Sequence, residues 1–202
     1  MTDIRRTLLR GMADIVGDLY GGPMPVRSTA TLKSADAPVP AKQPALPPFS
    51  QLWKTADETI DWTDILVYPT PTDGLTPPDK WTLYRQHAEG ILKGDVAAYL
   101  AFLHAENPMD DLTPYVSALD VTTVDADTLR ATFTVRADLM EQDADTYLCG
   151  MALRIARDLM AILPVTTVRV EADGHLDVIF SRAELQKVRF TFVDPVAFVE
   201  AL

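Results

Sequence analysis

The stretch that decides the fold is Asp143–Arg182, DADTYLCGMALRIARDLMAILPVTTVRVEADGHLDVIFSR. Residues 144–163 place apolar side chains at helical spacing, and Pro164 ends that run. Two alternating segments follow, separated by Asp173-Gly174, a residue pair typical of tight hairpin turns. The stretch therefore predicts a long buried helix followed by a β-hairpin, and it contains no catalytic motif.

The segments before this stretch predict further helices and another hairpin. Residues 119–124 and 128–136 alternate in polarity and are separated by a short turn sequence. Two amphipathic helices are predicted upstream, over 81–92 and from Asp95 to Asn107. A short strand is predicted at Ile65–Tyr68, because these residues form a compact run of strand-favouring side chains.

Helix-start signals complete the pattern at the C-terminal end. Ser181 to Glu184 is a capping box, and Asp194-Pro195 is typical of an N-cap followed by the first helical residue. The order of elements predicts an α+β fold, with a mostly antiparallel sheet of two β-hairpins around a long central helix and additional N-terminal helices.

Three regions differ in composition. Residues 1–20 predict an amphipathic helix, and residues 21–50 predict a Pro/Ala-rich flexible linker, since seven of the chain's 15 prolines lie there. Residues 51–202 are expected to form a single α+β domain. A tethered helix of this kind can recruit a partner or pack on its own domain.

Composition limits the classes of function. The chain has 202 residues and a net charge of −11, which disfavours binding to nucleic acid or to anionic membranes. Charged residues within 144–163 argue against a membrane span. The single cysteine, Cys149, allows no intrachain disulfide and is typical of a reducing compartment. We therefore expect an acidic, soluble, cytoplasmic protein.

Several segments, taken in order, resemble the C-terminal module of a group of uncharacterised bacterial proteins of unknown function. The segments are Asn107–Leu112, Tyr147–Gly150, Leu153–Arg157, Ala161–Val165, Ser181-Arg182 and Phe192–Pro195. The resemblance covers roughly residues 81–202. The chain departs from the group in a shorter segment between Arg136 and Tyr147 and a tighter turn at Asp173-Gly174. A helix and linker also replace the group's usual β-rich N-terminal domain. The resemblance implies a bacterial source and no particular activity.

Residues with catalytic potential do not form a recognisable motif. Cys149 lies within the apolar helix and is best interpreted as a small core side chain. The three histidines, His87, His104 and His175, lack metal-ligand spacing. Nine acids between Asp110 and Asp145 have structural roles available in turns and at helix ends. No catalytic residue, metal ligand or cofactor is predicted.

Three arginines are the candidates for binding an anion or a partner: Arg154, Arg157 and Arg182. Guanidinium groups bind carboxylates and other anions with fork geometry. The simpler interpretation is ion pairing within the fold, to Asp158, Glu184 or Asp194.

The sequence favours an accessory module that binds another protein and has no catalytic activity. The alternative is an enzyme or a small-ligand sensor whose site is assembled from dispersed Arg, Asp and Glu residues. No nucleic-acid partner and no stable membrane association are expected, and the oligomeric state is open.

Overall fold

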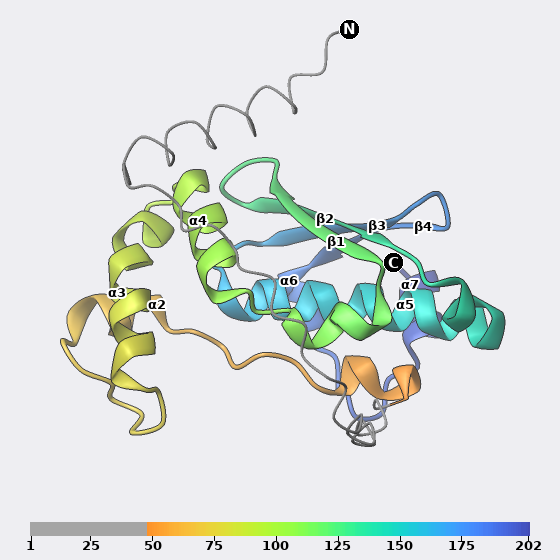
Figure 1. Cartoon of the computed structure of the whole chain (residues 1–202), viewed down its shortest axis with the longest axis horizontal. Helices are drawn as coiled ribbons and strands as arrows, with labels where there is room; N and C mark the ends of the chain where they lie inside the picture. The colour runs from red at the N-terminus through yellow and green to blue at the C-terminus, as the bar shows by residue number, and fades with distance from the viewer. Residues whose placement is uncertain (1–47) are drawn as a thin grey trace, which may run out of the picture. The chain divides into compact units, whose positions relative to one another are not determined.

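The computed structural model describes residues 48–202 (Figure 1). The chain divides into two units, Met1–Pro44 and Ala45–Leu202, and the description below concerns the second. The helix predicted over 1–20 and almost all of the linker predicted over 21–50 lie outside the described residues.

A single four-stranded sheet is the centre of the described unit, with the strand order β1-β2-β3-β4. The strands are β1 (Ala118–Thr123), β2 (Thr128–Thr134), β3 (Thr167–Ala172) and β4 (Leu176–Ser181). Both predicted hairpins are present, since β1 pairs antiparallel with β2 and β3 pairs antiparallel with β4.

The prediction of a mostly antiparallel sheet is wrong at the centre of the sheet. Strands β2 and β3 are parallel neighbours, so the sheet is mixed. The reason is the long helix between the two hairpins. It carries the chain back along the sheet, so that β3 starts beside the start of β2, and a crossover of this kind produces parallel pairing.

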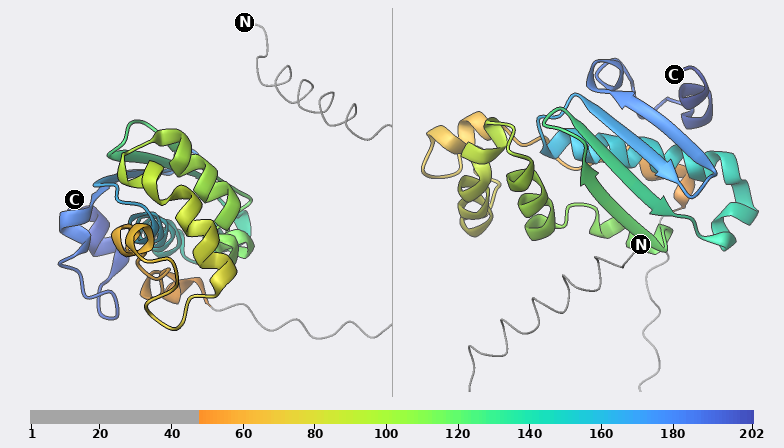
Figure 2. Two further views of the ribbon diagram at one scale, coloured as in Figure 1. Left: turned by 90° about the vertical axis from the view of Figure 1, so that its left-hand side faces the viewer. Right: turned by 90° about the horizontal axis from the view of Figure 1, so that it is seen from above.

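That helix, α5 (Ala137–Ile162), covers one face of the sheet (Figures 1 and 2). Asp143 interrupts it with φ −164° and ψ 90°, and its side chain accepts a hydrogen bond from the Thr146 amide at 3.1 Å. The segment after Asp143 matches the helix predicted over 144–163, whereas the helical segment 137–142 before it was not predicted. No helix within residues 48–202 combines the length and the apolar character needed to cross a membrane.

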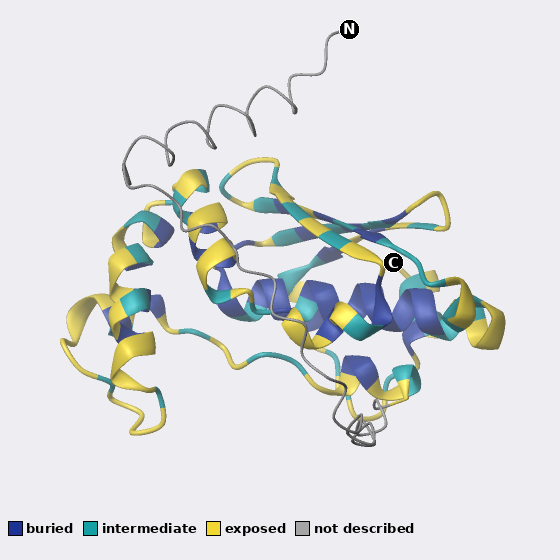
Figure 3. Ribbon diagram, viewed as in Figure 1, coloured by how far each residue is buried: buried dark blue, intermediate teal, exposed yellow. Residues whose placement is uncertain are grey.

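The sheet face against α5 is buried, and the opposite face is more exposed (Figure 3). Alternate residues of β2, β3 and β4 are buried under α5: Leu129, Ala131, Phe133, Val168, Val170, Ala172, Val178 and Phe180. On the polar face, Arg169 pairs with Glu171 at 2.9 Å and with Asp177 at 2.5 Å. The period-two alternation of the sequence thus corresponds to one buried and one open face.

Three helices precede the sheet: α2 (Trp62–Val67), α3 (Pro78–Leu92) and α4 (Val96–Glu106). The helices α3 and α4 match the predictions, and Gly94 between them has a left-handed φ of 71°. The strand predicted at Ile65–Tyr68 is wrong, because this segment belongs to α2. Asp61 starts that helix by accepting hydrogen bonds from the amides of Thr63 and Asp64, both at 3.0 Å.

Four short elements complete the unit: the 3-10 helices η1 (Phe49–Lys54) and η2 (Asp110–Tyr115) and the helices α6 (Arg182–Leu185) and α7 (Pro195–Glu200). The capping box at Ser181 and the Asp194 cap are present, as predicted. The sequence did not predict η1 and η2. Since η1 packs directly on α5, the buried core extends to the start of the described chain.

Candidate functional site

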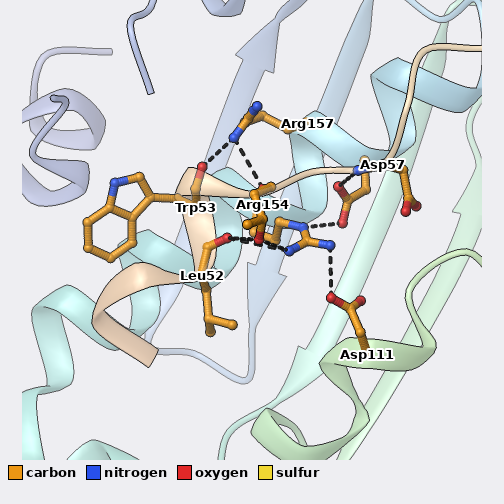
Figure 4. Close-up of polar contacts among 8 residues, drawn as sticks. Leu52, Trp53, Asp57, Asp111, Arg154 and Arg157 are labelled. Atoms are coloured by element: carbon orange, nitrogen blue, oxygen red, sulfur yellow. Dashed lines mark hydrogen bonds and ion pairs between the residues drawn. The ribbon is translucent and has the colours of Figure 1, made fainter. Parts of the chain in front are cut away.

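Arg154, the first of the predicted binding arginines, lies inside the fold between α5, η1 and η2 (Figure 4). Its side chain is only 5% exposed. The guanidinium donates to Asp158 at 2.6 Å, to the Thr55 hydroxyl at 2.6 Å and to Asp111 at 2.9 Å. Arg154 therefore pairs with Asp158, one of the partners that the sequence suggested, and joins three separate segments of the chain.

Asp158 is fully buried beside Arg154. Its second oxygen, Oδ1, accepts a hydrogen bond from the Asp57 amide at 2.9 Å. Burial raises the pKa of Asp158 to about 7, and the neighbouring Arg154 charge and the two hydrogen bonds offset only part of that effect. This carboxyl group is therefore protonated at mildly acidic pH.

Arg157 and Arg182 also bind acceptors within the fold. Arg157 donates to the backbone carbonyls of Trp53 and Thr55, and its guanidinium stacks on Phe190 at 3.5 Å from the ring centre. Arg182 donates to the Val165 and Leu163 carbonyls at 2.8 and 2.7 Å. The three arginines do not line the cleft or the groove described below.

The other predicted chemical residues lie in separate places. Cys149 is buried, and burial raises the pKa of its thiol to about 11. His87 contacts the ring of Phe102, whereas His175 lies in the β3–β4 turn. Within residues 48–202 no three His, Cys, Asp or Glu side chains are grouped so that they could hold a metal ion.

The acids between Asp110 and Asp145 do not form one surface. They are distributed over η2, β1, the β1–β2 turn and the start of α5. Several have local structural roles: Asp125 accepts the Asp127 amide at 2.9 Å, and Asp138 binds the Arg136 side chain at 2.8 and 3.0 Å. Their number in the sequence therefore does not correspond to a single binding patch.

The described unit has a cleft of about 820 Å³ among its upstream helices. It lies between the segment 57–61, the loop 72–77, the start of α3 and the residues that follow α4. Seven acidic residues line it: Asp57, Glu58, Asp61, Asp64, Asp73, Glu106 and Asp110. A hollow with this lining favours ligands that carry positive charge.

Aromatic and aliphatic side chains form the apolar part of the cleft wall. Ile65, Trp81 and Tyr84 lie there, and all three are buried. Behind them, Trp62 packs edge-on against Phe102 at 4.9 Å, and its indole nitrogen donates to the Ile162 carbonyl at 2.7 Å. This packing attaches the three upstream helices to the end of α5 and holds the wall rigid.

Lys80 is the one basic residue among those lining the cleft, and it is already paired. Its ammonium group contacts Glu106 and lies 5.6 Å from the centre of the Tyr84 ring. The hydrogen bond to Glu106 raises the pKa of Lys80. Tyr84 donates to the same carboxylate at 3.2 Å. The remaining acids of the lining are therefore not neutralised by a lysine or arginine of the wall.

Asp57 connects the cleft with the buried network around Arg154. Its backbone amide donates to Asp158, while its side chain lies in the cleft lining. The Oδ2 atom is buried without a hydrogen-bond partner within residues 48–202. Burial raises the pKa of Asp57, and the Arg154 charge opposes that shift.

Sequence reasoning missed this cleft. Its acids follow no metal or catalytic spacing, and they come from the segment around α2, which the sequence suggested was partly a strand. The available signal was a local excess of acid over residues 57–79, where the basic residues are absent.

Comparison with protein-family models, with curated proteins and with solved structures gave no match to this chain. The resemblance to a bacterial C-terminal module therefore stays a prediction.

Proposed function

We propose that this chain is a protein-binding module that holds a positively charged segment of another protein in the acidic cleft. The observation that carries the proposal is the lining of the cleft: seven acids and one already paired lysine around a buried aromatic wall. Carboxylates next to aromatic surface suit Lys and Arg side chains, which carry a charge at the end of an apolar stem.

The chemistry of such binding follows from the two parts of the wall. The stem of a partner lysine or arginine packs on apolar side chains of the lining such as Ile60 and Leu75, with the edge of Trp81 beside them. Its charged end reaches Glu58, Asp64 or Asp110.

Long-range attraction supports the same assignment. The chain carries a net charge of −11, so a basic partner is attracted before contact. We expect the association rate to fall as the salt concentration rises, because exposed charges are screened over about 10 Å at 0.1 M ionic strength.

The experiment is crosslinked capture from a lysate of the native host with two matched variants. The first variant, Glu58→Lys with Asp110→Lys, reverses two exposed acids of the cleft whose side chains have no hydrogen bond or ion pair within residues 48–202. The second, Glu141→Lys with Glu200→Lys, makes the same change of charge at exposed positions outside the cleft lining.

We expect one reproducible basic partner that the wild type and the second variant retain and the first variant loses. Equal capture by all three proteins would contradict the assignment of the cleft. Circular dichroism of both variants checks that the loss does not come from unfolding.

A second candidate is a sensor of a small organic cation. The cleft volume of about 820 Å³ lies within the range of small-ligand sites, roughly 300–1,000 Å³. A polyamine such as spermidine is a suitable probe. A rise in melting temperature with spermidine that the first variant abolishes would favour the sensor, and no change would favour the protein partner.

A further inference from the structure

We infer that the free edge of β1, with the groove beside it, binds an extended peptide segment of a partner as a fifth strand of the sheet. This inference concerns a second hollow, which shares only Asn107 and Pro108 with the lining of the acidic cleft, and it does not depend on the function proposed above. The occupant we assign has apolar side chains at alternate positions on one face and basic side chains on the other.

The first observation is the position and register of β1. The strand is the first in the sheet order, so among residues 48–202 only its β2 side is paired. The Val124 amide donates to the Thr128 carbonyl at 2.9 Å. Val124 and Thr128 continue the register of the β1–β2 ladder, so they form one of its hydrogen-bonded residue pairs. Because such pairs alternate in an antiparallel ladder, the backbone groups of Val121 and Thr123 point away from β2. They are available to another strand.

The second observation is a groove of about 420 Å³ along this edge. Consecutive residues 116–121 form one side of it, and the rest comes from α4, the residues after α4 and η2. Its apolar members include Leu100, Leu103, Met109 and Val116. Leu100 is among the exposed large apolar residues, at 38% exposed.

One added strand could pair with the free edge of β1 and fill the groove at the same time. Figure 2, in its right-hand view, shows α4 and the η2 segment on the β1 side of the sheet, next to the free edge. Side chains at alternate positions of an added strand would enter the groove, while its backbone pairs with β1. Strand addition of this type obtains affinity from the backbone bonds and specificity from such pockets.

The charge on the polar face of β1 determines which side chains the bound peptide carries on that same face. Asp120 is exposed on the polar face of β1, opposite Thr132 of β2, and the next outward residue is Thr122. A basic side chain directly opposite an acid stabilises a strand pair by about 0.2–1 kcal/mol, whereas an acid there would be destabilising. We therefore assign Lys or Arg to the outward positions of the peptide.

A second copy of the chain fits this edge less well than a peptide. Two β1 strands paired edge to edge would bring two sets of α4 and η2 to the same side of the sheet, where one set already forms the groove. The peptide has no such elements of its own. It also lacks the net charge of −11 with which two copies would repel each other.

The test uses the full chain and a defined probe, the fluorescein-labelled peptide KVTVKVTVK with blocked ends, measured by fluorescence anisotropy. Val121→Pro removes one outward N–H and leaves the β2 side intact, a position at which edge strands tolerate proline. Asp120→Lys reverses the outward charge. Glu200→Lys makes the same charge change in α7 and serves as the control.

We expect the peptide to bind the wild type and the control equally, and both edge variants at least tenfold more weakly. A peptide N-methylated at every second residue, on the edge that faces β1, should also bind at least tenfold more weakly. Amide resonances of Leu119, Val121 and Thr123 should shift on binding, which distinguishes edge pairing from loss of fold in a variant.

Binding that is unaffected by Val121→Pro and by N-methylation would overturn the inference, as would no binding at millimolar peptide. Binding lost only in the Glu58→Lys, Asp110→Lys variant would place the peptide in the acidic cleft. That result would overturn the edge proposal and leave the proposed function standing.

Discussion

Arg154 and Asp158 form a buried ion pair at the point where α5 meets the segment before α2. Asp158 is 0% exposed and Arg154 is 4% exposed, so both charges are removed from water. A pair of this kind is costly to bury, and the cost is offset only when each member has further hydrogen bonds. Both have them here, through Thr55, Asp111 and the Asp57 amide.

We expect Arg154→Met to destabilise the protein by about 3–5 kcal/mol at pH 8, because it leaves the buried Asp158 carboxylate unpaired. At pH 5 Asp158 is neutral, so only the lost hydrogen bonds remain and the cost falls to about 1–3 kcal/mol. Urea unfolding at the two pH values measures both. A cost that does not depend on pH would contradict a titrating Asp158.

The raised pKa of Asp158 also predicts how the stability of the wild type changes with pH. Its pKa is raised from 3.8 to about 7, so the folded state holds the proton more tightly than the unfolded state. Its contribution to stability is therefore fully present below pH 3.8 and is lost as the pH rises through 7. Relative to Asp158→Asn, the wild type should lose up to about 4 kcal/mol over that range.

The measurement is the free energy of unfolding of both proteins between pH 4 and pH 8. If the wild type gained stability relative to Asp158→Asn as the pH rose, the carboxyl group would have a depressed pKa and the assignment would be wrong.

At the scale of elements, η1 and α5 pack so closely that a larger side chain at their contact would clash. A Cβ atom on Gly150 would lie 2.8 Å from the nearest atom of the Trp53 ring. Trp53 is buried there, and its indole nitrogen donates to the Val193 carbonyl at 3.2 Å. Glycine at this position of α5 is therefore explained by packing, despite its lower helix propensity.

We expect Gly150→Ala to destabilise the protein by about 1–3 kcal/mol, because overpacking outweighs the gain in helix propensity. In the background of Trp53→Leu, the same change should cost less than in the wild type. A double-mutant cycle of thermal or urea unfolding measures this coupling. Equal costs in both backgrounds would show that Gly150 and Trp53 do not interact.

The elements also show how far the sequence alone could predict the fold. Local signals identified the hairpins, the capping box at Ser181 and the helix start after Asp143, because each depends on neighbouring residues. The parallel pairing of β2 with β3 depends on the path of α5 and has no local signal. Residues 65–68 favoured a strand, but the Asp61 cap and packing of Trp62 against α3 and α4 make the segment helical.

The candidate site was predicted less well than the fold. The sequence suggested three arginines as anion-binding residues, because guanidinium groups bind anions. In the structure, Arg154, Arg157 and Arg182 instead donate to acceptor groups of the protein itself. The acids of the cleft are close together only in the folded chain, where α2, α3 and the residues after α4 lie next to one another. Their spacing in the sequence contains no period that a pattern could detect.

At the scale of the whole molecule, the described unit has two hollows for which we propose a role in recognition. The acidic cleft lies among the upstream helices, and the free β1 edge lies on the sheet. Asn107 and Pro108 line both, so the two hollows meet at the segment after α4. One partner segment that is extended and basic has the chemistry to contact both.

The most direct test of the cleft is site-specific photocrosslinking. A photoreactive amino acid replaces Glu58, which lies in the cleft lining, or Glu200 as the control, and each protein is irradiated in lysate of the native host. We predict that the Glu58 position crosslinks to a lysine- or arginine-rich segment of one partner protein, less strongly as salt increases, and that the Glu200 position does not. Identical crosslinks from both positions, or none from Glu58, would contradict the account.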